Sequence, residues 1–378
     1  MPNQERFEFD ARQLSRNDDD LLAEDRLHFL ALSRFRGIGF ASMRLLYDRF
    51  PRLADVWPAP PETLVGVLKG GGALSKAGIF DLLASRSQLL KDAQLELDRM
   101  RRRGIELVTD RDPRYPASLR DLSERPRWLF VQGDVGLLQA NSVAVVGTRE
   151  PTEEGLQAAR TVATILIELG IPVVSGLAEG VDAAVHQAVI DLGGRGIAVL
   201  GHGINVIFPA ATAGIREGIV KGGGLLVSEY LPYEQYSRQR FIHRNRIQAA
   251  LARLVVPIQG AWKSGTAHTV SFAEQLGREV IGVQCGVLDS VPQNEIVGAL
   301  RAQGHRVYDL REEQEALRQF FSRYENAPVR RLAGGKLQAL TREFQRLLAQ
   351  YEVSESDLED LFTALREIWR GSRGPRAS

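Results

Sequence analysis

The hydrophobic period of the chain changes at Gly104, and this change constrains the fold more than any other feature. From there to Leu310, short β-branched apolar runs alternate with segments whose apolar residues recur every three or four positions. Continuous apolar strands separated by such helices are typical of a parallel sheet with helices on both faces. The expected strands are 105–110, 127–133, 142–147, 171–176, 195–201, 224–229, 254–260, 279–284 and 306–310. The expected helices among them are 155–170, 181–193, 244–252 and 268–277.

We therefore expect residues 104–310 to form a doubly wound, mainly parallel α/β sheet of the Rossmann-like type. Before it, residues 25–103 have a helical period and predict a small all-α domain, whereas the polar and acidic residues 1–24 predict a disordered lead. After it, residues 311–370 predict a short helical C-terminal region, and residues 371–378 a disordered tail. A length of 378 residues suits a division into two or three domains.

Composition narrows the class of protein. No apolar run is long enough to cross a bilayer, and the polar start lacks the apolar stretch of a signal peptide, so we expect a cytoplasmic protein with no membrane partner. The single cysteine, Cys285, excludes an intrachain disulfide and a cysteine-based zinc cluster. The net charge is only +1, so any binding of nucleic acid must depend on a local basic patch.

Gly147, Thr148 and Arg149 follow one predicted strand and precede a helix start. At the carboxyl edge of an open parallel sheet, helix N-termini present free N–H groups to anions. The three-glycine dinucleotide fingerprint is absent here, and so is a phosphate-loop lysine. Arg149 adds a forked charge that suits a single phosphate. The alternative is an ordinary strand-to-helix turn with a surface arginine.

Two further strands end in glycine-containing loops. Ser175 and Gly176 follow the strand at 171–176, and Asp182 and His186 lie four residues apart on the next helix. Such a pair could act as an acid and a base, but pairs at this spacing are more often structural. The loop that opens at Gly201 is by itself only weakly informative.

A basic cluster surrounds Phe241, in what we expect to be a loop and the first turn of a helix. Its members are Arg238, Arg240, His243, Arg244 and Arg246. Basic side chains are unfavourable at a helix N-terminus unless an anion is present. Arginines beside an aromatic ring suit a phosphodiester backbone and a stacked base, although a solvated basic face is the alternative.

A second turn that could hold an anion begins at Lys263, directly after another predicted strand. Two anion-binding turns and an arginine cluster exceed what one mononucleotide needs, and this favours a polymer or a large nucleotide. The predicted binding residues are Gly147, Thr148, Arg149, Ser175, Gly176, Arg240, Phe241, Arg244, Asn245, Arg246, Lys263, Ser264, Gly265 and Thr266. We predict no catalytic residue, no metal site and no cofactor.

In order and spacing, these motifs resemble those of the DNA-processing protein A family, also called Smf, over roughly residues 104–285. The N-terminal helical region is similar to that family's helix-hairpin-helix or sterile-alpha-motif-like domain. The residues that carry the resemblance are Gly147, Thr148, Arg149, Ser175, Gly176, Leu177, Ala178, Gly180, Asp182, His186, Gly201, Gly203, Pro209, Ser228, Glu229, Tyr230, Phe241, Arg244, Asn245, Arg246, Ile247, Ser264, Gly265 and Thr269.

The resemblance implies a non-enzymatic protein that binds single-stranded DNA and loads a RecA-type recombinase onto it during natural transformation. It also implies a homodimer joined through the Rossmann-like domain. On this interpretation, Arg149, Arg244 and Arg246 hold the phosphate backbone, and Phe241 stacks on a base.

The chain departs from the family pattern at several positions. They are Glu179 in place of Arg, Asn205 in place of Asp, Phe208 in place of Tyr, Gln259 in place of Glu, and Pro257 within a predicted strand. Proline in a central strand removes a ladder donor, so we expect an edge or a bulge there. The C-terminal region does not resemble a winged helix. A specialised relative, such as a subunit of a mobile-element or defence system, is therefore an open alternative.

A rival hypothesis is a Rossmann-like protein that senses or processes a nucleotide. Phosphoribohydrolases of similar fold carry the pattern PGGxGTxxE, of which only Gly265-Thr266 is matched here. Thr269 stands where hydrolysis needs a carboxylate, which argues against hydrolysis but not against sensing.

Overall fold

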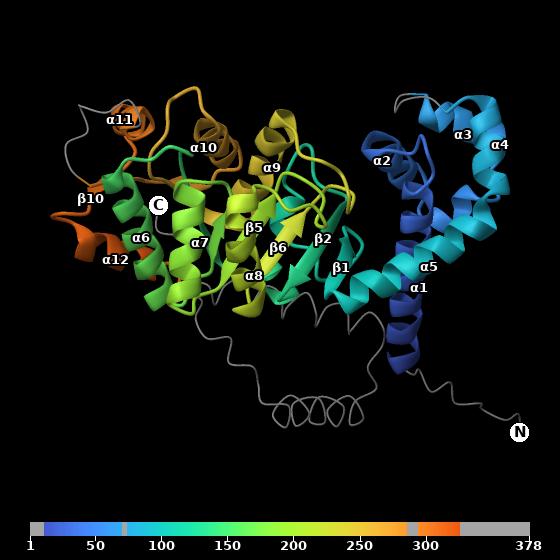
Figure 1. Ribbon diagram of the computed structural model, residues 1–378, viewed down its shortest axis with the longest axis horizontal. Helices are drawn as coiled ribbons and strands as arrows, with labels where there is room; N and C mark the ends of the chain where they lie inside the picture. The colour runs from blue at the N-terminus through green and yellow to red at the C-terminus, as the bar shows by residue number, and fades with distance from the viewer. Residues whose placement is uncertain (1–10, 70–73, 286–293, 326–378) are drawn as a thin grey trace, which may run out of the picture. The chain divides into compact units, whose positions relative to one another are not determined.

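The computed structural model describes residues 11–69, 74–285 and 294–325, with side chains from residue 20 onward (Figure 1). The chain divides into two compact units, residues 1–326 and 327–378, and everything below concerns the first. The C-terminal helices that we expected beyond residue 325, the tail at 371–378 and the first ten residues of the lead lie outside the described residues. Within the described ranges, none of the helices combines the length and the apolar character that crossing a bilayer requires.

An eight-stranded sheet forms the centre of this unit, and it confirms the predicted mainly parallel α/β fold. Its order is β1-β2-β6-β5-β4-β3-β7-β8. Strand β2 runs antiparallel to both of its neighbours, whereas the pairings from β6 to β8 are parallel. The strands are β1 (Ile105–Thr109), β2 (Trp128–Gly133), β3 (Ser142–Val146), β4 (Val173–Ser175), β5 (Gly196–Leu200), β6 (Leu225–Ser228), β7 (Ala252–Pro257) and β8 (Glu279–Val280). The stretch expected as one strand at 279–284 splits, because β9 (Gly282–Gln284) pairs with β10 (Val307–Asp309) in a second, two-stranded parallel sheet.

Helices cover both faces of the large sheet, as continuous apolar strands require. In β3, Val143 and Val145 pack in the cluster of α6 and α7, whereas Ala144 and Val146 pack on the opposite face with α9 and α10. Figure 1 shows α6, α7 and α8 side by side across the near face. The helices of this part are α6 (Glu153–Glu168), α7 (Val181–Asp191), α8 (Ala213–Lys221), α9 (Arg238–Leu251), α10 (Gly265–Gln275), α11 (Glu295–Ala302) and α12 (Gln314–Ser322). Short 3-10 turns are η2 (Ala117–Leu119), η3 (Val135–Gln139) and η4 (Ala210–Thr212).

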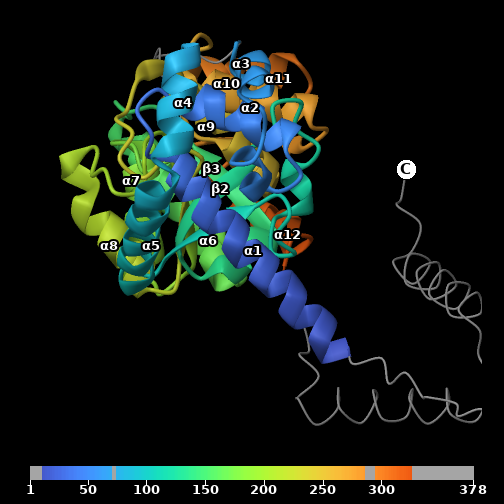
Figure 2. The same ribbon diagram turned by 90° about the vertical axis from the view of Figure 1, so that its right-hand side faces the viewer.

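The N-terminal helices pack against one another and against the sheet, as the view in Figure 2 shows. They are α1 (Ala11–Ser33), α2 (Phe40–Arg49), η1 (Leu53–Val56), α3 (Pro61–Leu68), α4 (Lys76–Ala84) and α5 (Arg86–Arg102). Their buried side chains share one apolar cluster with β2, in which the ring of Phe29 meets that of Trp128 edge-on at 4.8 Å. This packing fixes α5 beside the sheet.

Helix α1 begins at Ala11, so residues 11–24 are helical where we expected a disordered lead. A contact at the end of this segment is ionic rather than apolar. Glu24 accepts a hydrogen bond from Arg52 at 2.8 Å. The adjoining Asp25 accepts one from Arg111 at 2.8 Å.

Pro257 does not make β7 an edge strand, because β7 lies between β3 and β8. Ile258 donates its N–H to Val146 of β3, and the N–H of Ile281 reaches Val255 on the other side. Successive residues of a parallel strand face alternate neighbours, so Pro257 faces the β8 side, where β8 has already ended. No ladder donor is lost, and the irregularity of β7 lies instead at its start, between the pairings of Ser142 and Val143.

Candidate nucleic-acid interface

The loops that follow β3 to β7 gather at one edge of the sheet, because parallel strands end at the same edge. We call this edge the rim. Its loops are 147–152, 176–180, 201–212, 229–237 and 258–264. The chain order reverses between β3 and β7, so the loops at 147–152 and 258–264 flank the switch point where open α/β sheets bind ligands.

The loop after β3 is held rigidly by its neighbours and presents Arg149 to solvent. The N–H of Thr148 donates to the carbonyl of Gln259 at 2.8 Å, and its carbonyl accepts from Val181 at 3.1 Å. A Cβ at Gly147 would lie 2.6 Å from Val181, so glycine permits this close approach. The exposed guanidinium of Arg149 lies over the ring of Phe241, 5.2 Å from its centre.

The N-terminus of α6 is closed by a side chain of the protein itself. The amide oxygen of Gln259 accepts from the N–H of Thr152 at 3.0 Å, and its nitrogen donates to the Thr152 hydroxyl at 3.0 Å and to Asn294 at 2.9 Å. The Thr152 hydroxyl in turn accepts from the N–H of Gly155. These contacts engage the N–H groups of Thr152 and Gly155, whereas the side chain of Arg149 remains exposed.

Four residues of the second motif lie beneath the rim rather than on it. They are Ser175, Gly176, Asp182 and His186, all buried. The Ser175 hydroxyl donates to Val145 at 2.8 Å. Burial raises the pKa of Asp182, although the nearby guanidinium of Arg244 opposes this shift. Burial, together with Arg244, lowers the pKa of His186 to about 3. The Ser175 backbone lies near this imidazole, but neither ring nitrogen makes a hydrogen bond of acceptable geometry.

Arg244 links these buried groups to the sheet. Its guanidinium donates to the carbonyl of Val199, lies 3.9 Å from the Asp182 carboxylate, and packs so tightly on Gly176 that a Cβ there would lie 2.2 Å away. Burial, partly offset by Asp182, lowers the pKa of Arg244 to about 10. A side chain that is only 4% exposed and is engaged in this way does not reach the rim surface.

Arg246 is also internal. It donates to the Glu229 carboxylate at 2.6 Å, to the carbonyl of Glu124 at 2.9 Å and to that of His243 at 3.0 Å. Its side chain is 3% exposed and that of Glu229 is 2% exposed, so the two form a buried ion pair. Asn245, between Arg244 and Arg246 in sequence, donates to the carbonyl of Gly265 at 2.9 Å and links α9 to α10.

Arg244 and Arg246 do not lie at the surface as predicted, because α9 begins earlier than we expected. Ser237 caps the helix by accepting from the N–H of Arg240, so the first turn starts at Arg238. Arg244 and Arg246 therefore lie well inside the helix and face the core. Arg240 remains half-buried, donates to Glu234 at 3.0 Å and lies over the ring of Tyr230.

Three aromatic rings form a surface beside Arg149, which we call the aromatic platform. Phe208 and Tyr236 stack with 3.6 Å between ring centres, and Phe241 lies 5.8 Å from Phe208. Tyr236 is 46% exposed. A Cβ at Gly201 would lie 2.5 Å from the ring of Phe241, so this glycine lets the ring seat on the backbone. We did not predict Phe208 or Tyr236 as site residues; an aromatic residue just before the basic cluster was the available indication.

The loop after β7 supplies a separate positive charge. Lys263 is exposed, and no ion pair or hydrogen bond of its side chain is recorded within the described residues. Ser264 is the N-cap of α10, but its hydroxyl makes no capping bond and has no hydrogen-bond partner among the residues that the structure describes. Gly265 is exposed at the helix start, whereas Thr266 is buried against Gly260. Fewer internal hydrogen bonds therefore engage the second predicted anion turn than the first.

Acidic side chains also lie on the rim, so its charge is mixed. Glu150 and Glu179 are exposed on the loops after β3 and β4. In the described ranges, no group of three or more His, Cys, Asp or Glu residues is placed to hold a metal ion. The structure thus brings together Arg149, Phe241 and the platform rings at the surface, and it places Ser175, Arg244 and Arg246 beneath them.

A family model for DNA recombination-mediator protein A matches residues 106–304, more than half of the 378-residue chain. Protein Smf of Synechocystis is 32% identical over 263 residues, which cover 68% of this chain and 64% of that protein. DNA processing protein DprA of Streptococcus pneumoniae is 36% identical over 180 residues, covering 48% of this chain and 63% of the relative. The matches thus span less than two thirds of these relatives.

Two solved structures have a fold similar to that of this chain. The crystal structure of DNA processing protein A from S. pneumoniae superimposes with a TM-score of 0.56 at 25% identity, covering 75% of this chain and 93% of that one. The fold of DNA processing protein A from Helicobacter pylori, studied for its single-stranded DNA binding mode, is similar, with a TM-score of 0.50 at 23% identity over 57% of this chain and 96% of that one. The chain belongs to the DNA recombination-mediator protein A family.

Proposed function

We propose that the protein binds single-stranded DNA along the rim and acts as a recombination mediator. The observation that carries the proposal is the Arg149 guanidinium placed over Phe241, beside the stacked and partly exposed pair Phe208 and Tyr236. A forked cation next to stacked aromatic rings can hold a phosphate while a neighbouring base stacks. Lys263 offers a second contact to the backbone farther along the rim.

Family membership supports the wider role. Relatives of this chain carry the name DNA processing protein, and the H. pylori protein was studied for its binding of single-stranded DNA. We infer that this protein likewise delivers a bound strand to a RecA-type recombinase during DNA uptake. We also propose that it works in the cytoplasm as a homodimer joined through the Rossmann-like domain.

We further propose that the protein performs no covalent chemistry of its own. The pair that most resembled an acid and a base, Asp182 and His186, is buried. The Asp182 carboxylate is already engaged, because it accepts from the N–H of Ala178 at 3.4 Å and lies 3.9 Å from Arg244. The closure of the α6 N-terminus by Gln259 likewise disfavours a mononucleotide site at the switch point.

The test is a titration of fluorescent oligo-dT, and separately of mononucleotides, at several salt concentrations. We expect the oligonucleotide to bind and the Arg149→Ala variant to bind it more weakly, with the slope of log affinity against log salt flattened by about 0.7 to 1. Arg195→Ala is the matched control, because Arg195 is exposed and precedes β5 at the opposite edge of the sheet. Tight binding of mononucleotides without binding of oligo-dT would overturn the proposal in favour of a nucleotide sensor.

A further inference from the structure

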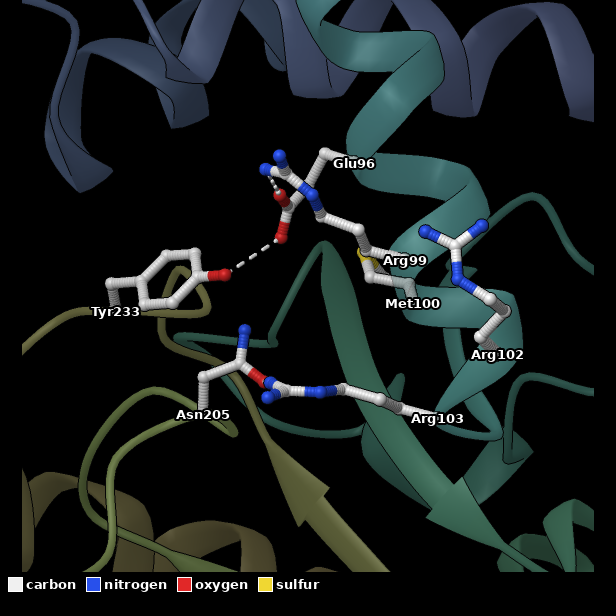
Figure 3. A pocket seen from close by; sticks show the side chains of 7 residues that line it. All are labelled: Glu96, Arg99, Met100, Arg102, Arg103, Asn205 and Tyr233. Atoms are coloured by element: carbon white, nitrogen blue, oxygen red, sulfur yellow. Dashed lines mark hydrogen bonds and ion pairs between the residues drawn. The ribbon is translucent and has the colours of Figure 1, made fainter.

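A pocket of about 270 Å³ lies where the C-terminal end of α5 faces the loops after β5 and β6 (Figure 3). We call it the arginine pocket. It is lined by Glu96, Arg99, Met100, Arg102, Arg103, Asn205 and Tyr233. Figure 3 shows Arg103 reaching across the pocket to Asn205, while Tyr233 and Arg99 both bond to Glu96.

The positive charge of this pocket is not balanced by its own acid. Glu96 is the one carboxylate among the lining residues, against three arginines. It is already shared by Arg99 at 3.4 Å, by Arg34 at 3.7 Å and by the Tyr233 hydroxyl at 3.1 Å. No ion pair or hydrogen bond of the Arg102 side chain is recorded in the part of the chain that the structure describes. Unpaired guanidinium groups are suited to an anionic ligand.

A fourth arginine binds the same loop. Arg216 is partly buried and donates to the carbonyls of Ile204 and Val206, which flank the Asn205 that accepts from Arg103, and no carboxylate is among its contacts in the described residues. Burial lowers the pKa of Arg216, and the positive charge of Arg103 lowers it further. An anion bound between α5 and the loop at 201–212 would relieve this repulsion.

The pocket adjoins the rim through two loops. Asn205 belongs to the same loop as Phe208, and Tyr233 belongs to the same loop as Tyr236. Both loops therefore carry one side chain of the aromatic platform and one side chain of the pocket. In each loop the two residues are three positions apart, so their Cα atoms lie within about 11 Å of one another.

We propose that the arginine pocket binds a phosphate group of the same nucleic-acid strand and so extends the interface from the sheet onto helix α5. This inference rests on the proposed function. A free phosphate offers the same chemistry, but the connection of the pocket to the platform through two shared loops favours a phosphate within a polymer. Arg102 and Arg103 supply the contacts to the phosphate.

Because Asn205 is neutral, it leaves the positive charge of the pocket in place. Its side-chain oxygen accepts from Arg103 at 3.0 Å without neutralising the guanidinium. An aspartate in the same place, the residue that the family pattern carries, would form an ion pair with Arg103 and reduce the attraction for phosphate. The variant Asn205→Asp therefore changes the charge of the pocket at almost constant shape.

The experiment compares oligo-dT of about 3 and about 25 nucleotides, lengths that lie below and above the usual site size of a single-strand platform. The wild-type protein, Arg102→Ala, Asn205→Asp and the control Arg101→Ala are titrated with both lengths by fluorescence anisotropy. Arg101 is adjacent in sequence and equally charged, but it pairs with Asp98 at 3.6 Å and does not line the pocket. We expect Arg102→Ala and Asn205→Asp to weaken binding of the long oligonucleotide several-fold, flatten its salt slope by about 0.7 each, and leave the short one unchanged.

Three other results would overturn the inference. Long and short oligonucleotides could bind all variants as they bind the wild type, or Arg102→Ala could weaken both lengths equally. Alternatively, inorganic phosphate could raise the Tm of the wild type but not of Arg102→Ala while oligonucleotide binding stays the same, which would assign the pocket to free phosphate. Failure of the proposed function is distinguishable, because the wild-type protein would then bind neither length.

Discussion

The arginines of the predicted binding motifs have different roles in this protein. Arg149 lies at the surface over an aromatic ring, whereas Arg244 and Arg246 lie under the rim and hold other elements in place. Charge in a motif therefore does not by itself identify a DNA contact. We expect substitution of Arg149 to weaken DNA binding, and substitution of Arg246, or of the glycine that packs on Arg244, to lower stability.

The Arg246–Glu229 pair provides the first such test. Replacing Arg246 by Met leaves the Glu229 carboxylate buried without its partner, which should lower the free energy of unfolding by about 3 to 5 kcal/mol. The double variant Arg246→Met with Glu229→Leu should recover a large part of that loss, because the buried charge is removed as well. Urea unfolding of the wild type, Arg246→Met, Glu229→Leu and the double variant measures the coupling, and additive losses would contradict it.

Gly176 tests the packing of Arg244. A methyl group there would lie 2.2 Å from the guanidinium nitrogens, so Gly176→Ala should cost about 1 to 3 kcal/mol of unfolding free energy by forcing the buried side chain to move. Gly214→Ala is the control, since a Cβ at this position in α8 meets nothing within 4 Å. It should leave stability unchanged or raise it by up to about 1 kcal/mol. Equal Tm values for the two variants would show that Arg244 moves freely.

At the level of helices and strands, the period of the apolar residues was sufficient to predict most of the large sheet. Strand β3, for example, is buried along its whole length, and a strand buried on both faces needs apolar residues at successive positions. The start of α9 was predicted six residues too late, because the arginines of its first turns hide the helical period and the cap at Ser237 was not recognised. That error placed two buried arginines at the surface.

The contacts that close the switch point could not be predicted from the sequence. Gln259 meets Thr152 across 107 residues, and no local pattern reports such a contact. The aromatic platform likewise joins residues from the loops after β5 and β6 with α9. The convergence of parallel strand ends at one edge, together with the resemblance to a family, indicated that these loops share a site.

The role of Gln259 in joining α6 to its surroundings can be measured. Gln259→Ala removes the bonds to the Thr152 N–H, the Thr152 hydroxyl and Asn294, and should lower the unfolding free energy by about 1 to 3 kcal/mol. Gln275→Ala is the control, because its exposed amide bonds to Ser271 one turn earlier. It should change stability by less than about 0.5 kcal/mol. Unfolding curves that coincide for both variants would mean that the closure contributes nothing.

On the scale of the whole molecule, we expect the burial of His186 to lower the stability of the protein in acid. The pKa of this histidine is lowered to about 3 by burial and by Arg244, whereas the unfolded chain has the ordinary value of 6.5. Between these values the unfolded chain binds a proton that the folded protein does not bind. Stability from this group is therefore lost as the pH falls through that window, by up to about 1.4 kcal/mol per pH unit.

The variant His186→Leu isolates this effect, because Asp182 and Arg244, the charged groups that face the imidazole, are kept. The raised pKa of Asp182 acts in the opposite direction and remains in both proteins. Urea unfolding from pH 7 to pH 4 should show the wild type losing stability faster than the variant as the pH falls. Parallel curves would mean that the imidazole is protonated in the folded protein.

The net charge of +1 limits how DNA can be held, because no broad positive field draws the strand in. Binding must depend on a few local cations, such as Arg149 and Lys263, and on stacking. If about three phosphates are neutralised, log affinity should fall with log salt at a slope of about −2, which is a loss of roughly fifteen-fold to twenty-fold between 50 and 200 mM salt. Duplex DNA of equal length should bind more weakly, because its paired bases cannot reach Phe208, Tyr236 and Phe241. Anisotropy titrations of both DNAs measure this difference; equal affinity, or a slope several times steeper, would assign the binding to charge alone and leave the aromatic platform without a role.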